Sequence, residues 1–385
     1  MNSTVRIMSQ ARIPLAMLLV AAACGDGQPT GPSLAAEKFP ALQVFECTAN
    51  VASGSVSCAS PLPTGGNFAI IGGQNDNVRL TSSDVTAVGG IFSFNVTVQN
   101  LLPEAMGTPD GLALDTAGIS VFFHRGPTVT AGTGTVTVAN EDGSKEFTAP
   151  NQPYFRYSEV LSQDEVSASK TWQLAYTAGV QTFTFKVYVA AVLQPLLVIN
   201  EVLANPRSGA LPPGATGITD ANGEWFEVYN AGRFPVQMQG MTISDSSSGS
   251  SGKQKYHVIA SSLLVEPGAY VVLGNNANTS TNGGVPVDYA YPNTALMLAN
   301  TIDAIKLSRS LTPGDTLALF TVDRIQYADG TKSAKDGVSR ELLNPVLDNS
   351  NVDGSFWADA LPGATYGPSG LTRGTPKAQN STYTP

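Results

Sequence analysis

The feature that most constrains this fold is a two-residue alternation of apolar and polar side chains that recurs along the chain. In residues 92–98, phenylalanine and valine alternate with serine, asparagine and threonine, and similar patterns occupy residues 135–138 and 182–189. Period-2 alternation of β-branched and aromatic residues indicates strands with one buried and one solvated face. Clusters of Gly, Asn, Asp and Pro separate these segments, and no long segment has helical periodicity. The sequence therefore predicts an all-β protein built from antiparallel sandwiches.

A change of composition near Gln194-Pro195 predicts two β-rich halves. The first half is rich in threonine, whereas the second has longer loops of Asn, Asp, Pro and Gly. No flexible linker separates them, so we expect the halves to pack rigidly against each other. We expect a signal peptide at residues 1–23, a flexible tether at 24–40, an uncharacterised β-sandwich domain at 41–194 and a second sandwich domain at 195–380.

The N-terminal residues have the order of a secretory signal peptide. Arg6 and Arg12 precede an apolar run at residues 13–23, which ends in three alanines followed by Cys24. As a helix this run would rise about 16 Å, which is about half of the hydrocarbon core of a bilayer. Residues 25–32 are polar and rich in Gly and Pro, and this composition is typical of a flexible spacer.

The position of Cys24 resembles the lipobox of bacterial lipoproteins, although Ala21 stands where that family usually has leucine. The resemblance implies that Cys24 is lipidated, becomes the new N-terminus and anchors the protein to a membrane. The alternative is ordinary cleavage near the same alanines, which would leave a secreted protein with a free Cys24. Both readings predict an exported protein, and the first places it at the cell envelope or surface.

Cys47 and Cys58 form an even pair if Cys24 is lipidated. They flank a segment that is expected to be a hairpin turning at Ser53-Gly54. Facing cysteines in such a hairpin predict a disulfide, which would contribute about 2–3 kcal/mol. Ten intervening residues fit neither a Cys-x-x-Cys redox motif nor a zinc knuckle, so a redox or metal pair is the weaker alternative.

The second half contains an ordered set of motifs. Residues 199–202 read Ile-Asn-Glu-Val, residues 223–230 read Gly-Glu-Trp-Phe-Glu-Val-Tyr-Asn, and the chain closes with Ser339-Arg340-Glu341, Gly374-Thr375-Pro376 and Asn380. Over residues 196–380 this set resembles the bacterial form of the lamin tail domain. The resemblance implies an immunoglobulin-like β-sandwich that serves interaction or architecture rather than one shared catalytic mechanism.

Four acidic residues of the second half are the candidate metal ligands: Glu201, Asp220, Glu224 and Glu227. Period 2 places Glu224 and Glu227 on opposite faces unless a bulge intervenes, so one of them is expected to meet Glu201 and Asp220 at a strand end. Carboxylate oxygens there would suit a structural Ca²⁺ ion. The alternative is that these carboxylates satisfy backbone groups or arginines, and that residues 220–223 form a turn.

Charge and motif content restrict the function. The chain carries a net charge of −9 with 13% charged residues and has no basic run, which argues against nucleic acid as a partner. Its two histidines lack metalloprotease spacing, and neither a Gly-x-Ser-x-Gly elbow nor a phosphate loop occurs.

The sequence therefore predicts a non-catalytic exported lipoprotein without a cofactor, apart from the calcium alternative. Its partners would be the membrane, through the lipid, and an unknown envelope protein or glycan. One alternative is a calcium-assisted carbohydrate-binding or adhesive surface module. Another is a hydrolase with an unrecognised carboxylate pair, because such a pair needs only two acidic residues.

Overall fold

Strands account for almost all of the regular structure in this chain. The computed structural model describes residues 45–59, 68–72, 74–208, 218–248, 254–310, 319–333, 335–370 and 372–385. Strand is the dominant structure in these residues, and only two helices of four residues each occur among them, which confirms the all-β prediction. The predicted signal peptide, the tether and Cys24 lie outside the described residues. Within the described ranges, no helix has the length and apolar character needed to cross a membrane.

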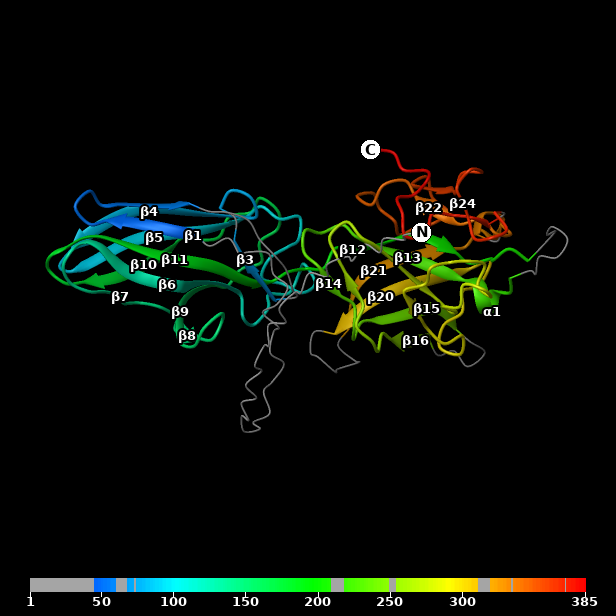
Figure 1. Ribbon diagram of the computed structural model, residues 1–385, viewed down its shortest axis with the longest axis horizontal. Helices are drawn as coiled ribbons and strands as arrows, with labels where there is room; N and C mark the ends of the chain where they lie inside the picture. The colour runs from blue at the N-terminus through cyan, green and yellow to red at the C-terminus, as the bar shows by residue number, and fades with distance from the viewer. Residues whose placement is uncertain are drawn as a thin grey trace, which may run out of the picture. The chain divides into compact units, whose positions relative to one another are not determined.

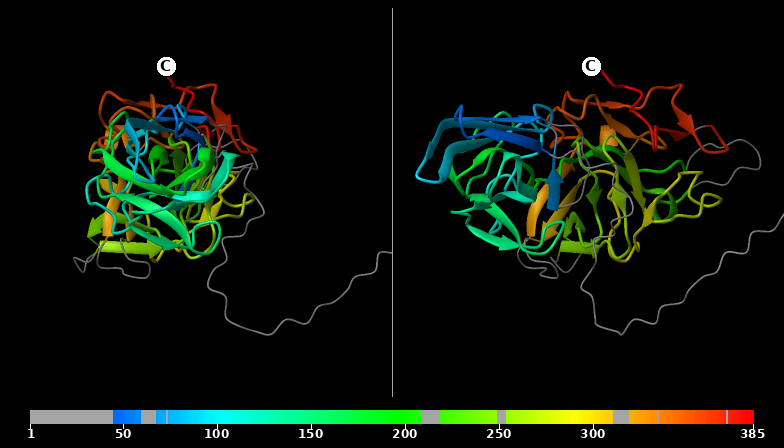
Figure 2. Two further views of the ribbon diagram at one scale, coloured as in Figure 1. Left: turned by 90° about the vertical axis from the view of Figure 1, so that its left-hand side faces the viewer. Right: turned by 60° about the vertical axis from the view of Figure 1, so that its left-hand side comes forward.

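Two antiparallel sheets form the first half (Figures 1 and 2). The seven-stranded sheet has the order β2-β1-β11-β6-β9-β8, with β3 also paired to β11, and a four-stranded sheet has the order β4-β5-β10-β7. The strands are β1 (Phe45–Asn50), β2 (Ser55–Ala59), β3 (Phe68–Ile71), β4 (Val78–Val88), β5 (Ile91–Asn100), β6 (Ile119–Gly132), β7 (Val136–Val138), β8 (Gly143–Lys145), β9 (Gln152–Tyr157), β10 (Lys170–Tyr176) and β11 (Val180–Val192).

The alternating residues of β5 and β11 build the core between these sheets. Every second residue of β5 is buried, as the sequence pattern predicts. Phe92 of β5 packs edge-on against Phe183 of β11, with ring centroids 5.4 Å apart, and Phe94 stacks on Phe185 at 6.3 Å. Burial of each such side chain contributes about 2–3 kcal/mol, so this aromatic layer holds the two sheets together.

The second half also consists of two main sheets. A six-stranded sheet has the order β19-β18-β13-β12-β22-β23, and a second four-stranded sheet has the order β16-β15-β20-β21. Two small ladders, β14-β17 and β24-β25, accompany them. The strands of the six-stranded sheet are β12 (Leu197–Leu203), β13 (Trp225–Asn230), β18 (Tyr270–Gly274), β19 (Tyr289–Ala290), β22 (Arg340–Leu342) and β23 (Trp357–Asp359). The remaining elements are α1 (Asp220–Gly223), β14 (Val236–Gln237), β15 (Thr242–Ser248), β16 (Gln254–Val258), β17 (Leu264–Val265), β20 (Asp303–Ser310), β21 (Leu319–Tyr327), α2 (Gly330–Ser333), β24 (Thr365–Tyr366) and β25 (Thr372–Arg373).

Both faces of the six-stranded sheet are covered. On one face, Ile199 and Phe226 share a core with Ile305 of the second four-stranded sheet. On the other face, Trp225 packs with Leu203 and Val272, and Tyr366 lies against this group. The indole N–H of Trp225 donates to the Tyr366 hydroxyl at 3.0 Å. Residues near the C-terminus therefore form a third layer over the sheet.

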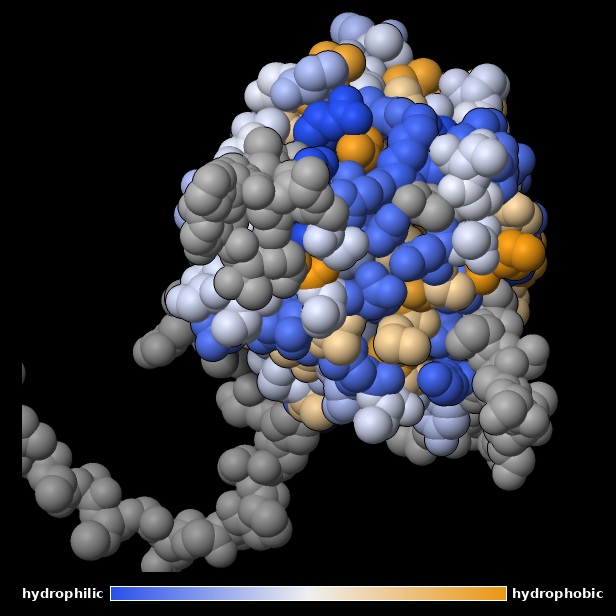
Figure 3. All heavy atoms as spheres, turned by 90° about the vertical axis from the view of Figure 1, so that its right-hand side faces the viewer, coloured by the Kyte–Doolittle hydropathy of each residue, from blue (hydrophilic) through white to orange (hydrophobic). Residues whose placement is uncertain are grey.

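The surface is polar without being strongly charged. The face drawn in Figure 3 is mostly hydrophilic, and its apolar residues form small separate areas. Because only 13% of all residues are charged, uncharged polar side chains carry much of this character. Single exposed apolar residues are ordinary on protein surfaces.

Candidate functional site

Three glutamates lie side by side across the middle of the six-stranded sheet. Glu201 of β12 is the register partner of Glu227 of β13 on one side and of Glu341 of β22 on the other. All three side chains are fully buried. We call these three residues the glutamate row. Buried carboxyl groups require hydrogen bonds or protons, so their surroundings decide what the row can do.

Residues 374–382, which we call the C-terminal cover, close over the glutamate row. The Thr375 backbone N–H donates to Glu201 Oε1 at 2.9 Å, and Ser339 Oγ donates to the same oxygen at 2.5 Å. Glu341 Oε2 accepts from Ser381 Oγ at 2.7 Å and from the Thr382 N–H at 3.0 Å. A Cβ atom at Gly374 would lie 2.7 Å from Glu201 Oε1, so a glycine is needed where the cover crosses the row.

A bulge in β12 places Glu201 beside Glu227. The register between β12 and β13 shifts between Ile199 and Glu201, which leaves Asn200 as the extra residue. Asn200 Nδ2 donates to Glu227 Oε1 at 3.0 Å, and the Lys377 N–H donates to Glu227 Oε2 at 2.5 Å. Asn380 Nδ2 donates to the backbone carbonyl of Asn200 at 2.9 Å. The bulge is thereby tied to the C-terminal cover.

The contacts of the Thr375 hydroxyl favour a proton within the glutamate row. The Thr375 hydroxyl lies 3.1 Å from Glu201 Oε2 and 3.1 Å from Glu341 Oε1, yet it has one proton to donate. A protonated Glu201 resolves this, because it donates to the hydroxyl while the hydroxyl donates to Glu341. Burial, followed by the charges of Glu227 and Glu341, raises the pKa of Glu201 well above its usual value. Burial also raises the pKa of Glu227 to about 8.

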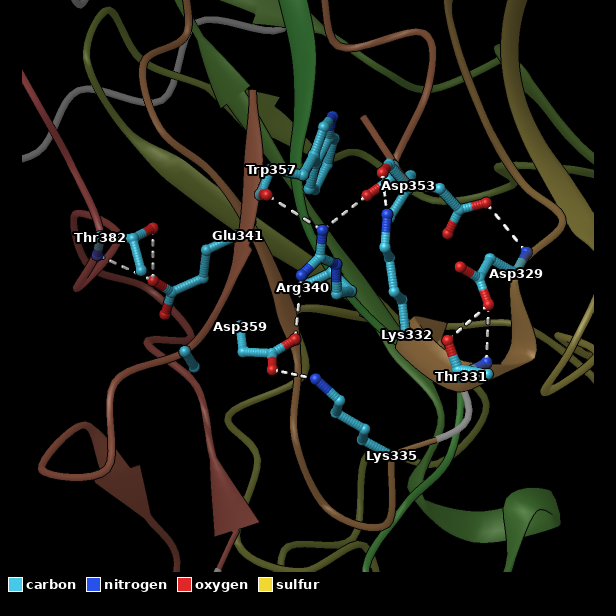
Figure 4. A network of polar contacts seen from close by, with 12 residues as sticks. Asp329, Thr331, Lys332, Lys335, Arg340, Glu341, Asp353, Trp357, Asp359 and Thr382 are labelled. Atoms are coloured by element: carbon cyan, nitrogen blue, oxygen red, sulfur yellow. Dashed lines mark hydrogen bonds and ion pairs between the residues drawn. The ribbon is translucent and has the colours of Figure 1, made fainter. Parts of the chain in front are cut away.

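Figure 4 shows how β22 separates two polar networks. Glu341 extends toward Thr382 in the C-terminal cover, whereas Arg340 extends toward Trp357 and Asp359. The Arg340 guanidinium bonds Asp359 Oδ1 at 2.9 Å and the Trp357 carbonyl at 3.0 Å. Adjacent residues of a strand point to opposite faces, so this cation does not neutralise the glutamate row.

The other two predicted ligands belong to a different group. Glu224 is 1% exposed, and its Oε2 accepts from the Leu298 N–H at 2.8 Å. Asn275 Nδ2 bonds both the Asp220 carbonyl, at 2.6 Å, and Glu224 Oε2, at 3.4 Å. Burial, followed by nearby acidic residues of which Asp220 is the first, raises the pKa of Glu224 to about 9. The structure thus brings Glu201 to Glu227 and places Asp220 with Glu224.

No group of three or more His, Cys, Asp or Glu side chains in the described part of the chain is arranged to hold a metal ion. The residues of the glutamate row instead bond backbone N–H groups, hydroxyl groups and an asparagine amide. These contacts fix the C-terminal cover on the sheet. The calcium site at Glu201, Asp220, Glu224 and Glu227 stays a prediction.

The cysteines of the first hairpin form a disulfide, as predicted. Cys47 of β1 and Cys58 of β2 are direct register partners, and their sulfur atoms are 2.07 Å apart. The turn between these strands contains Gly54 with φ +57°, a conformation that glycine adopts readily. The bridge therefore ties the edge strand β2 to β1 in the seven-stranded sheet.

The two histidines contact polar and aromatic side chains of the protein itself. His124 contacts Thr148 and Tyr188, whereas His257 contacts Tyr289, so the two histidines share no site. Phe155 and Tyr157 of β9 are buried in the core of the first half.

Part of the second half matches the model of a known protein family. Residues 194–332 match the family model of the Lamin Tail Domain. The match covers β12 to α2 and includes Glu201, Glu224 and Glu227. No curated protein matches the chain, and neither does any solved structure. We call residues 195–385 the lamin-tail-like domain, of which the match covers the part up to residue 332.

Several residues of this site in the lamin-tail-like domain were not predicted as site residues. Glu341, Thr375 and Asn380 lie beyond the matched segment, yet they complete the glutamate row and its cover. Their motifs, Ser339-Arg340-Glu341 and Gly374-Thr375-Pro376, were visible in the sequence. Their contacts with Glu201 become visible only in the folded structure. Ser339 and Thr375 are 138 and 174 positions from Glu201 in the sequence, and a local pattern does not report contacts between residues so far apart.

Proposed function

We propose that this protein is a non-catalytic exported lipoprotein whose lamin-tail-like domain serves protein interaction or cell-envelope architecture. The observation that carries this proposal is the match of residues 194–332 to the lamin tail domain. The matched segment forms most of a two-sheet sandwich, which is the framework expected for an immunoglobulin-like interaction module.

The state of the acidic residues supports a non-catalytic role. A general acid or base must come within hydrogen-bond reach of the substrate proton. Glu201, Glu227 and Glu341 are fully buried, and each bonds groups of the protein itself. These bonds hold the C-terminal cover on the sheet, which is a structural role.

Export and anchoring are supported by the N-terminal sequence and the disulfide. Disulfides persist mainly in oxidising compartments outside the cytosol. Detergent phase partitioning of the full chain tests the anchor, with Cys24→Ser as the variant. We expect the native protein in the detergent phase and Cys24→Ser in the aqueous phase. Equal partitioning of the two would contradict lipidation.

The interaction role is tested by binding the full chain to fractionated envelope proteins and to a glycan panel, each with Ca²⁺ and with EGTA. We expect a saturable complex with a defined envelope protein that forms equally well in EGTA. Binding to glycans alone, or turnover of any glycan, would overturn the proposal in favour of a carbohydrate module or a hydrolase.

A pair of tyrosines supports the carbohydrate-binding module as a second candidate. Tyr229 of β13 and Tyr270 of β18 are register partners with ring centroids 4.8 Å apart, and both rings are half-buried. Partly exposed aromatic faces are suitable for packing against sugar rings. Loss of glycan binding in Tyr229→Ala, with unchanged binding in the control Tyr256→Ala, would identify this surface. Calcium dependence of the binding would support the predicted calcium site at Glu201, Asp220, Glu224 and Glu227.

A further inference from the structure

Two loops, one from each half of the chain, have the same pattern of internal hydrogen bonds. The first loop follows β5 and spans residues 100–104. Asn100 is fully buried, and its Nδ2 donates to the carbonyl of Glu104 at 2.8 Å and to that of Leu161 at 2.9 Å. Its Oδ1 accepts from the Leu102 N–H at 3.0 Å. A single asparagine thus fixes the whole loop.

The second loop follows β13 and spans residues 230–234. Asn230 is also fully buried, and its Nδ2 donates to the carbonyl of Phe234 at 2.8 Å and to that of Val265 at 2.9 Å. Its Oδ1 accepts from the Gly232 N–H at 3.0 Å. Each asparagine therefore holds the residue four positions ahead, which is Glu104 in one loop and Phe234 in the other.

These two held residues meet each other. Glu104 is 2% exposed, and its Oε1 accepts from the backbone N–H of Arg233 at 2.5 Å and from that of Phe234 at 3.2 Å. A Cβ atom at Gly232 would collide with the same carboxylate oxygen, so only glycine lets the loops approach this closely. The contact is preformed, since both loops are fixed by their own asparagines.

Phe234 carries the contact into the core of the first half. Its side chain is 4% exposed and packs in the same apolar cluster as Leu102 and Met106, although it belongs to the second half of the sequence. Arg233 adds a peripheral bond from Nη1 to the Asp76 carbonyl at 3.2 Å. The described residues of both halves also belong to one compact unit.

We propose that residues 100–104 and 230–234 form a lock that makes the two halves unfold and move as one body. Phe234 supplies the apolar anchor, and the Glu104 carboxylate caps the backbone that presents it. The first half is then a rigid mount that fixes how the lamin-tail-like domain is presented. Without the lock, the short connection between β11 and β12 would act as a hinge.

Calorimetry of the full chain tests the lock with Phe234→Ala. We expect the native protein to unfold in a single transition, with a calorimetric enthalpy close to its van't Hoff enthalpy. In Phe234→Ala the transition should split, so that this enthalpy ratio rises to about two. Phe183→Ala is the matched control, because it removes an equally buried phenylalanine from the first half's core. It should lower the temperature of one undivided transition.

Native-state hydrogen exchange provides a second measurement, which does not require complete unfolding. In the native protein, the slowest amides of β5 and β20 should open with the same frequency, whereas in Phe234→Ala one set should open at least about tenfold more often than the other. Glu104→Ala should act in the same direction, and Glu104→Gln should not, because glutamine keeps an acceptor oxygen. One undivided transition and equal opening in both Phe234→Ala and Glu104→Ala would overturn the proposal. Splitting in Phe183→Ala would do the same.

Discussion

Glu201→Gln is a sharp test of the protonated glutamate row. In the native protein a protonated Glu201 donates to Thr375 Oγ1 and accepts from Ser339 and from the Thr375 N–H. A glutamine reproduces each of these bonds, because its Nε2 donates and its Oε1 accepts. The variant is therefore a permanent copy of the protonated state, and we expect it to fold with the cover in place.

The size of the effect follows from proton linkage. The usual pKa of a glutamate is 4.5, and in the folded protein the pKa of Glu201 lies well above it. Between these two values the folded state holds a proton that the unfolded state has lost, so the free energy of unfolding falls as the pH rises. One such proton corresponds to about 1.4 kcal/mol per pH unit for as long as the pH lies between these two pKa values. The variant Glu201→Gln has no titrating group at this position, so this fall of its unfolding free energy with pH is absent.

Urea unfolding at pH 5.5, 6.5 and 7.5 measures the difference. We expect the free energy of unfolding of Glu201→Gln to fall less steeply with pH than that of the native protein. The exposed Glu266 offers a matched control, since Glu266→Gln changes the same charge without touching the row. Parallel pH profiles for the native protein and Glu201→Gln would refute a proton on Glu201.

Three further outcomes are expected. Replacing Cys47 and Cys58 together by alanine should lower the free energy of unfolding by about 3 kcal/mol, the value for a loop closed over an 11-residue separation, and a change below 1 kcal/mol in calorimetry would contradict this. A double-mutant cycle of Trp225→Phe and Tyr366→Phe should give a coupling of about 1 kcal/mol from their hydrogen bond, whereas additive losses would disprove it. An NMR titration should place the pKa of His257 below its usual 6.5, because burial disfavours the charged imidazolium. Any stability that depends on the neutral ring is therefore lost as the pH falls. A pKa of 6.5 or more would contradict this expectation.

Local sequence patterns predicted the strands and the hairpin disulfide because both depend on neighbouring residues. The alternation in residues 92–98 became β5, and the turn at Ser53-Gly54 placed Cys47 opposite Cys58. A two-residue period directly reports which side chains share a face. These parts of the fold required no knowledge of the rest of the chain.

The site was predicted only in part, because its geometry depends on distant contacts and on one irregular residue. The bulge at Asn200 changes which residues of β12 and β13 stand opposite each other, and alternation alone does not locate a bulge. Asp220 begins α1 and joins Glu224 through Asn275. The prediction grouped Glu201 with Asp220, whereas in the structure Glu201 lies beside Glu227 and Asp220 lies beside Glu224.

The contact between Asn200 and Asn380 spans 180 positions of the sequence. Strand β12 is synthesised early in its domain, yet Ser339 follows Glu201 by 138 positions and Asn380 follows Asn200 by 180 positions. Domains dominated by such distant contacts fold slowly, because the intervening chain must be ordered first. The lamin-tail-like domain therefore closes over its buried acids only once residues 374–382 have been synthesised. A fragment that ends at residue 332 would leave Glu201 and Glu227 without their cover.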